Sequence, residues 1–169
     1  MMKSQTAKEH QNESSKEISC GIITLSDSRK SKKADLSGQY MAEEIEKQYT
    51  LKSRKLIPDE KDDLLNAIEE MVSENVDVLL TTGGTGLAAR DITVETVEGL
   101  FEKKLDGFGE IFRAKSYEEI GSAAMLSRAT AGIYKKTVIF SMPGSPNAVK
   151  TALSIIIYEL PHFVNHTKK

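Results

Sequence analysis

The chain alternates short, almost wholly apolar runs with longer amphipathic segments, and this alternation limits its possible folds more than any other feature. The run 18–27 has the length and the Ile and Leu density of a β-strand buried on both faces. The run 76–82 is a short and almost wholly apolar strand, and 135–142 is a further expected strand. Strands of this kind occur in parallel sheets that helices cover on both sides. The sequence therefore predicts a mostly parallel sheet sandwiched between helices.

The segments between these strands carry helical patterns and further strands. Helix 61–75 has one apolar stripe at i, i+3, i+4 and i+7 spacing: Leu64, Leu65, Ile68, Met71 and Val72. Helix 38–49 begins with either Asp35 or Ser37 as its cap. The remaining expected elements are a strand over 49–60 that ends at Pro58 and Asp59, a helix over 93–104 with Thr93 as N-cap, two short helices over 107–129 broken at Gly121, a short strand over 131–134 and a long helix that starts at 148 and ends before Pro161.

Composition limits the class of protein further. A chain of 169 residues fits one domain, which we expect over 18–165. Residues 1–17 are polar and have no apolar core of the kind that a secretory signal carries, so we expect a disordered tail and a cytoplasmic protein. No apolar run approaches the roughly 20 residues of a membrane helix. The net charge of −2, with both signs interspersed, argues against a general nucleic-acid binder.

The sequence lacks the residues that several common kinds of site require, namely redox, catalytic-triad and zinc sites. The single cysteine, Cys20, lies in an apolar run and is expected to be a buried thiol with no redox role. His10 lies in the tail, while His162 and His166 follow the last helix, so no catalytic triad is indicated. No cluster of Cys and His suggests zinc.

Unusual loops follow four of the expected strands. They are "SD" at Ser26 and Asp27, Pro58 with Asp59, "TTGGTG" at 81–86 and "SMPGSP" at 141–146. The carboxyl ends of parallel strands meet at one edge of the sheet, which is where ligands bind in open α/β folds. Hydroxyl groups at Ser26, Thr85, Ser141 and Ser145 are of the type that binds phosphate or a polar heterocycle. We therefore expect a ligand site at this edge.

The loop "TTGGTG" carries glycines at 83, 84 and 86. It has neither the GK[ST] ending of a P-loop nor the GxGxxG spacing of a dinucleotide fingerprint. Glycines without Cβ nevertheless allow consecutive backbone N–H groups to form a concavity that binds anions. The loop is either such a cradle or a structural turn.

Two aspartates would lie beside that cradle. A carboxylate at Asp91 would repel phosphate unless a divalent cation bridged the two, and Mg²⁺ takes one or two carboxylates together with phosphate oxygens. Asp91 could otherwise cap the next helix. Asp59 could be a second ligand or simply a residue at a helix start.

Together these motifs resemble the MoaB/MogA family of molybdenum cofactor biosynthesis, also found as the G domain of gephyrin. The resemblance runs from about residue 18 to residue 160 and rests on "TTGGTGLAARDITVE", "LDGFGEIFRAKSYEEIGSAAMLSRATAG" and "FSMPGSPNAVKTAL", in that order. The segment "YEEIGSAAMLSRA" is more similar to the MoaB branch than to the MogA branch. A MogA-type protein has an arginine directly after the first "SD", where this chain has Ser28 before Arg29.

The resemblance implies a fold, an activity and a set of site residues. The fold is a three-layer α/β/α sandwich that assembles as a homotrimer or a homohexamer. The activity is AMP transfer from Mg·ATP to the phosphate of molybdopterin, with release of pyrophosphate. The alternative is a non-catalytic molybdopterin carrier or assembly protein that serves other molybdenum cofactor enzymes. Asp59 and Asp91 would be catalytic and would hold Mg²⁺. The residues implied to bind nucleotide or pterin are Ser26, Asp27, Asp35, Ser37, Gly38, Gly83, Gly84, Thr85, Gly86, Thr93, Pro143, Gly144 and Ser145.

Overall fold

The structure is a computed structural model that describes residues 18–28 and 31–169, so the predicted disordered segment 1–17 lies outside the described residues. Its elements are β1 (Ser19–Leu25), η1 (Lys32–Ala34), α2 (Leu36–Glu46), β2 (Thr50–Ile57), α3 (Lys61–Ser73), β3 (Val78–Thr82), α4 (Thr93–Glu98), β4 (Lys103–Lys104), α5 (Asp106–Ile120), η2 (Gly121–Leu126), β5 (Thr130–Tyr134), β6 (Thr137–Met142), α6 (Pro146–Ile156) and α7 (Leu160–Thr167).

The strands form one mixed sheet in the order β2-β1-β3-β6-β5-β4. The first four of these strands are parallel, whereas β5 runs antiparallel to β6, and β4 antiparallel to β5. From β1 the chain adds β2 on one side and then β3 on the other, so the strand order reverses at β1. This reversal is the position at which open α/β sheets bind ligands.

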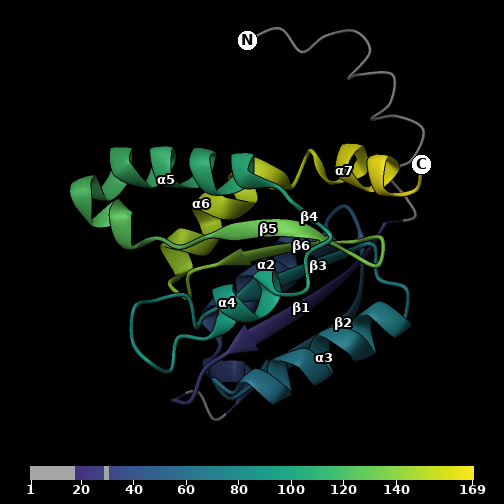
Figure 1. Cartoon of the computed structure of the whole chain (residues 1–169), viewed down its shortest axis with the longest axis horizontal. Coiled ribbons are helices and arrows are strands. Elements are labelled where there is room, and N and C mark those ends of the chain that lie inside the picture. Colours follow the sequence, from purple (N-terminus) through teal and green to yellow (C-terminus); the bar gives the residue numbers. More distant parts are fainter. Residues whose placement is uncertain (1–17, 29–30) are drawn as a thin grey trace, which may run out of the picture.

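Both faces of the sheet are covered, as the apolar runs predict. Side chains of β1, β3 and β6 alternate between two core clusters. One cluster joins the sheet to α2, α5, α6 and α7, and the other joins it to α3 and α4. Figure 1 shows α5, α6 and α7 on one side of the sheet and α3 on the other. The predicted three-layer α/β/α sandwich is confirmed.

The helix predicted over 93–104 is wrong in length and in its cap. Helix α4 ends at Glu98, and its N-cap is Ile92, so Thr93 is the first helical residue and not the cap. The chain then becomes extended because Phe101 packs its ring over Gly132 of β5, where an added Cβ would lie 2.3 Å from the ring. Strand β4 follows and pairs with β5. Because this contact joins segments that are distant in the sequence, local helix propensity does not predict it.

The predictions for the helices over 107–129 and from 148 onward differ from the structure in helix length. The break at Gly121 is present, at a φ of 62°, but a single helix of 15 residues precedes it in place of a short one. The long helix from 148 is wrong, because α6 ends at Ile156 and Pro161 lies in the first turn of the separate helix α7. A proline is tolerated in a first turn, where its missing N–H has no partner to lose. The Tyr49 hydroxyl donates to the carbonyl of Ile157, 2.6 Å away, at the end of α6.

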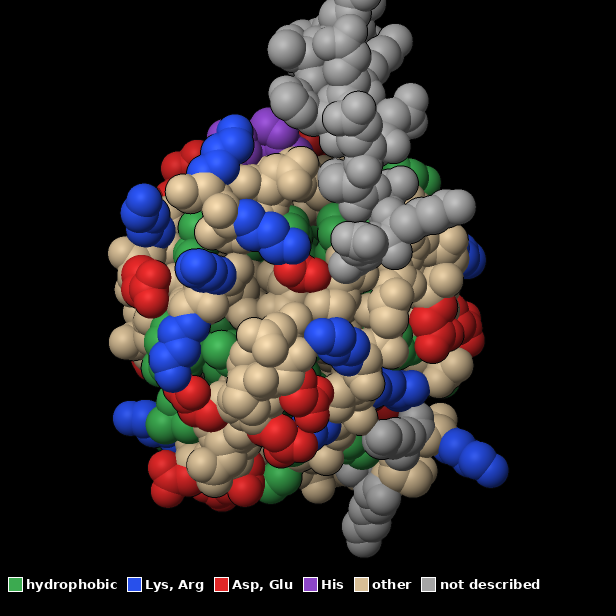
Figure 2. Space-filling model, turned by 90° about the vertical axis from the view of Figure 1, so that its right-hand side faces the viewer, with side chains coloured by type: hydrophobic (Ala, Val, Ile, Leu, Met, Phe, Trp, Pro, Cys, Tyr) green, Lys and Arg blue, Asp and Glu red, His purple; other side chains and the backbone are tan. Residues whose placement is uncertain are grey.

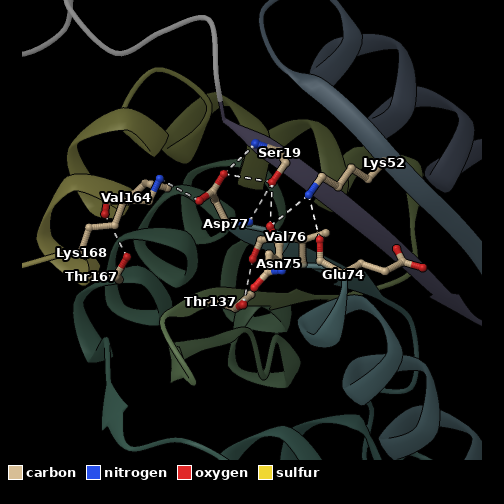
Figure 3. A network of polar contacts seen from close by, with 10 residues as sticks. All are labelled: Ser19, Lys52, Glu74, Asn75, Val76, Asp77, Thr137, Val164, Thr167 and Lys168. Carbon is tan, nitrogen blue, oxygen red and sulfur yellow. Dashed lines mark hydrogen bonds and ion pairs between the residues drawn. The ribbon is translucent and has the colours of Figure 1, made fainter.

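A polar network closes the amino-terminal edge of the sheet (Figure 3). Asp77 Oδ2 accepts hydrogen bonds from the backbone N–H and the hydroxyl of Ser19, both at 2.9 Å. The ammonium of Lys168, beyond α7, lies 3.0 Å from Asp77 Oδ1. Figure 2 views this edge and shows acidic and basic side chains interspersed, with neither sign dominating. The groups that fix this edge are therefore paired within the protein.

Within the part of the chain that the structure describes, every helix falls short of the length and apolar character that a membrane span requires.

Candidate active site

Four loops meet at the carboxyl edge of the parallel strands, as the sequence predicts. They follow β1, β2, β3 and β6, and β1 points to the side of Figure 1 on which the loop between β3 and α4 projects. Backbone hydrogen bonds join neighbouring loops. Ser26 N–H donates to the carbonyl of Ile57 at 2.9 Å, and Gly83 N–H donates to that of Met142 at 3.1 Å. The loops therefore form one continuous rim.

The glycine loop needs two of its glycines for their backbone conformation. Gly83 has a φ of 95° and Gly84 a φ of 64°, in the left-handed region that side chains disfavour. A Cβ at Gly83 would lie 2.3 Å from the backbone oxygen of Leu25. A Cβ at Gly144 would lie 3.2 Å from Gly83 Cα, so the loops after β1, β3 and β6 approach closely at this point.

Thr93, at the start of α4, fixes the peptides of the two glycines that have a positive φ. Its hydroxyl donates to the carbonyl of Gly83, and its backbone N–H donates to that of Gly84, each at 2.9 Å. The side chain is fully buried. Thr93, which the resemblance implies to be a ligand residue, thus sets the orientation of two consecutive peptide planes of the loop.

The loops after β1 and β2 are held to each other by reciprocal hydrogen bonds. Asp27 N–H donates to Asp59 Oδ2, and Asp59 N–H donates to Asp27 Oδ1, both at 3.0 Å. Arg90 donates from Nε to Asp27 Oδ2 at 2.6 Å and from its Nη2 to Glu60 Oε1 at 3.0 Å. One arginine of the glycine loop thereby ties together three segments of the rim.

Both predicted metal ligands lie against glycines of the same loop. A Cβ at Gly84 would lie 3.1 Å from Asp59 Oδ1, and a Cβ at Gly86 would lie 2.5 Å from Asp91 Oδ2. The missing side chains therefore make room for two carboxylates. Asp91 Oδ2 accepts a hydrogen bond from Ala88 N–H at 2.9 Å. It does not cap α4, and so the alternative of a simple capping role is wrong.

The charges of the rim favour a cation. Burial raises the pKa of Asp59 above its usual value, and the negative charges of Asp27 and Asp91 act in the same direction. The pKa of Asp27 is lowered, chiefly by its hydrogen bond from Arg90 and then by the one from Asp59 N–H. The hydrogen bond from Asp27 N–H and the charge of Arg90 lower the pKa of Asp59, but they do not offset burial and its two carboxylate neighbours. A divalent cation would relieve this repulsion.

The carboxylates of Asp59 and Asp91 are donors of the type that would suit Mg²⁺. Among residues 18–28 and 31–169, no group of three or more His, Cys, Asp or Glu side chains is placed to hold a metal ion. A protein cage is therefore not formed by the described residues. Two carboxylates beside an anion cradle suit a hard cation that keeps waters and takes its other ligands from phosphate oxygens.

Residues of the segment 35–38 form part of the support of the rim. Asp35 is the N-cap of α2 and is fully buried, with its carboxylate accepting from Gly38 N–H at 2.9 Å and from the Thr24 hydroxyl at 2.7 Å. Arg54 lies 3.0 Å from the same carboxylate. The Ser37 hydroxyl donates to the carbonyl of Gly144 at 2.7 Å. The segment thus joins the loop after β6 to the start of α2.

The remaining predicted residues lie along the rim. Ser145 is the N-cap of α6 and accepts from Ala148 N–H at 3.2 Å. The Thr82 hydroxyl donates to the carbonyl of Pro143 at 3.0 Å. Ser26 is partly exposed, whereas Thr85 is buried.

Sequence reasoning assigned no role to Arg128, which the structure places against the glycine loop. Its Nε donates to the carbonyl of Thr85 at 3.0 Å, and its guanidinium also contacts the carboxylate of Glu95 in α4. The quoted segment "YEEIGSAAMLSRA" contains this arginine, but the contact spans 43 positions and depends on β5 running antiparallel to β6. No local pattern reveals that contact.

Comparison with known proteins agrees with this geometry. A family model described as a probable molybdopterin binding domain matches residues 21–162. A molybdopterin adenylyltransferase of Pyrococcus furiosus is 46% identical over 166 residues, which are 95% of this chain and 98% of that relative. Molybdenum cofactor biosynthesis protein B of Bacillus subtilis is 44% identical over 168 residues, or 97% of this chain and 98% of its own length.

Solved structures show the same fold. The tungsten cofactor synthesizing protein MoaB from Pyrococcus furiosus has a TM-score of 0.84 at 45% identity, with 90% of this chain and 98% of that chain covered. A MogA structure has a TM-score of 0.80 at 26% identity, covering 88% of this chain and 99% of that chain. The chain belongs to the MoaB/MogA family of molybdenum cofactor biosynthesis proteins, which carries the molybdopterin-binding domain.

Proposed function

We propose that the protein binds molybdopterin and transfers AMP to it from Mg·ATP. An oxygen of the molybdopterin phosphate attacks the α-phosphorus of ATP, the bond from that phosphorus to the bridging oxygen breaks, and pyrophosphate leaves with the electron pair. The names of relatives at 46% and 45% identity, a molybdopterin adenylyltransferase and a probable one, support this reaction. The structural observation that carries it is the packing of two carboxylates, Asp59 and Asp91, against glycines of one strained loop.

The residues of the rim have distinct tasks in this proposal. Phosphoryl and nucleotidyl transfer depend mainly on positioning and charge neutralisation. The backbone N–H groups of residues 84–86 hold ATP phosphates, and Arg90 steadies the pyrophosphate. Asp59 and Asp91 hold Mg²⁺, which when bound neutralises phosphate charge. Ser26, Asp27 and Ser145 contact the pterin, while Asp35, Ser37, Gly38, Pro143 and Gly144 shape the walls around it.

A second function uses the same rim without turnover. Several relatives carry the name molybdenum cofactor biosynthesis protein B, which states a pathway and no reaction. A protein of this kind binds molybdopterin and passes it on to other molybdenum cofactor enzymes.

One assay separates the two functions. The purified protein is incubated anaerobically with molybdopterin, ATP and Mg²⁺, and pyrophosphate and adenylylated molybdopterin are measured. We expect both products in equal amounts, and both to be lost in the Asp91→Asn variant at limiting Mg²⁺. Tight molybdopterin binding with no pyrophosphate from the unaltered protein would reject the transferase in favour of the carrier.

We also propose a single domain over 18–165, a cytoplasmic location and a homotrimer or homohexamer. Exposed apolar side chains gather on α5 and η2, and they support an interface between copies: Ile111, Tyr117, Ile120, Met125 and Leu126. Sedimentation equilibrium measures the number of copies, and a monomer at micromolar concentration would contradict the assembly.

A further inference from the structure

The C-terminal helix α7 carries two histidines, His162 and His166, on one face. They are four positions apart in an α-helix, which makes their side chains neighbours on adjacent turns. Both side chains are exposed, and Figure 2 shows the purple histidine side chains together at the surface of the molecule. Their ring centroids lie 4.7 Å apart, with the ring planes at 70° to each other. The helix therefore presents two imidazole rings side by side to solvent.

The separation of the two rings is the one that a shared metal ion requires. A transition cation lies about 2.0–2.1 Å from an imidazole nitrogen. With the ligand angles of about 90–110° that square-planar and tetrahedral sites have, two rings on one cation have centroids roughly 4.5–5 Å apart. The 4.7 Å between the centroids of His162 and His166 falls within this range. The backbone of α7 therefore already holds the rings at the distance of a chelate.

The charges at the end of α7 also favour a bound cation. His166 lies in the last turn of the helix, where the backbone carbonyl groups carry partial negative charge. The next cation along the chain is Lys168, and its ammonium lies 3.0 Å from the carboxylate of Asp77. Because Asp77 balances this charge, Lys168 opposes a cation at the two histidines less than a free ammonium would.

The kind of ligand selects the kind of metal. Imidazole nitrogen suits Cu²⁺, Ni²⁺ and Zn²⁺, whereas Mg²⁺ prefers oxygen. The thiol of Cys20 is fully buried in the core and cannot reach a surface site. Among residues 18–28 and 31–169, no third His, Cys, Asp or Glu completes a metal-binding group. Water would therefore fill the other coordination positions, and the cation would exchange with solvent.

We propose that α7 carries a binding site for a divalent first-row transition cation, with His162 and His166 as its two protein ligands. The pairing of Lys168 with Asp77 fixes the end of α7 at the amino-terminal edge of the sheet, and Figure 1 shows α7 at the opposite end of the molecule from the loop between β3 and α4. The site is thus separate from the candidate active site. The inference goes beyond the proposed function and does not depend on it.

A cation at this position would stabilise the helix that holds it. Helix α7 has only eight residues, and a helix of this length is not stable by itself in water. Two ligands on adjacent turns favour the helical conformation when one cation binds both. A cation at 100 times its Kd shifts the folding equilibrium about 100-fold, provided that the unfolded chain does not bind it.

The test measures metal binding by the full chain without an affinity tag and without substrates. Ni²⁺ and Zn²⁺ are titrated by calorimetry, with and without excess Mg²⁺. The variants His162→Gln and His166→Gln each remove one ligand. A matched variant, His166→Thr with Thr167→His, keeps the composition but moves the second imidazole off the shared face. His10→Gln removes the third histidine of the chain, which lies outside the described residues, and circular dichroism shows whether each variant folds.

We expect the unaltered protein to bind one cation per chain, with no competition from Mg²⁺. Loss of a residue that merely supports a metal ligand costs about 10-fold to 100-fold in affinity, so removal of one of two ligands should cost at least as much. The matched variant should lose as much as His166→Gln, and His10→Gln should stay within about twofold of the unaltered protein. Saturating Zn²⁺ should raise the midpoint of thermal unfolding of the unaltered protein more than that of His166→Gln.

Several results would overturn the inference. One is an affinity that is unchanged in His166→Gln or in the matched variant, because the spacing of the two rings would then play no part. Another is an equal loss in His10→Gln, which would indicate binding to histidines in general. Loss of Ni²⁺ and Zn²⁺ binding in excess Mg²⁺ would place the cations at carboxylates, and failure of the unaltered, folded protein to bind either cation would exclude the site.

Discussion

Replacing Gly84 by alanine tests how the glycine loop is built. The residue has a φ of 64°, and the new Cβ would lie 2.4 Å from Thr93 Oγ1 and 3.1 Å from Asp59 Oδ1. A left-handed conformation costs a residue with a Cβ about 1–2 kcal/mol. The short contact also displaces the Thr93 hydroxyl from the Gly83 carbonyl, and an unpaired buried acceptor costs about 1–3 kcal/mol. We expect a total loss of roughly 2–5 kcal/mol.

This loss is measurable by urea unfolding at fixed protein concentration. The matched control is Gly107→Ala, in the exposed first turn of α5, where no heavy atom lies within 4 Å of the added Cβ. That variant should gain about 0.5–1 kcal/mol, because alanine suits a helix better than glycine does.

A double-mutant cycle isolates the contact with Thr93. In a Thr93→Ala background the threonine oxygen is absent, so Gly84→Ala should cost only the conformational term of about 1–2 kcal/mol. The two changes should therefore be non-additive by about 1–3 kcal/mol. Additivity within about 0.5 kcal/mol would refute the reasoning, as would equal stabilities of Gly84→Ala and Gly107→Ala.

Two further predictions concern buried titratable groups. Burial opposes ionisation of Asp35, but hydrogen bonds from Gly38 N–H, Thr24 and Arg54 outweigh it and hold its pKa below the usual value. Its contribution to stability is therefore complete above pH about 4 and lost as the pH falls through the lower folded pKa, so Asp35→Asn should flatten the acid limb of a stability profile below pH about 4. Burial, with a smaller effect of Asp77, raises the pKa of the Cys20 thiol to about 12. A disulfide reagent at pH 8 should then label Cys20 at the rate of unfolding, and fast labelling of the native protein would contradict its burial.

The sheet was predictable because most of its strands are formed by apolar runs that can be identified directly in the sequence. Apolar runs such as 18–27 are typical of strands buried on both faces, and the structure confirms this strand as β1. The antiparallel edge was predicted less well. Strand β4 has two residues, Lys103–Lys104, and its extended path depends on Phe101 packing over Gly132, a contact that no local pattern contains.

The location of the site was predictable from the sequence, whereas the individual contacts within it were less predictable. Strand-end loops converge by topology, which is why Asp27 and Asp59 could be expected on one rim before any geometry was known. The contact that requires a glycine at each position of the loop was not predictable in this way. Gly84 and Gly86 face carboxylates from different positions in the chain, and Arg128 reaches the loop from beyond α5.

The two edges of the sheet show why one aspartate is structural and another is available for chemistry. At the amino-terminal edge burial would raise the pKa of Asp77, but Ser19 and Lys168 more than compensate, and the pKa is lowered (Figure 3). At the carboxyl edge burial has the largest effect on Asp59 and raises its pKa, the charges of Asp27 and Asp91 act in the same direction, and the hydrogen bond from Asp27 N–H does not offset them. A carboxylate whose charge the protein balances has no need of a ligand, whereas one whose charge is disfavoured by burial and by like charges would be stabilised by a bound cation. The same residue type therefore closes one edge of the sheet, while at the other edge it supports the proposed binding of Mg·ATP.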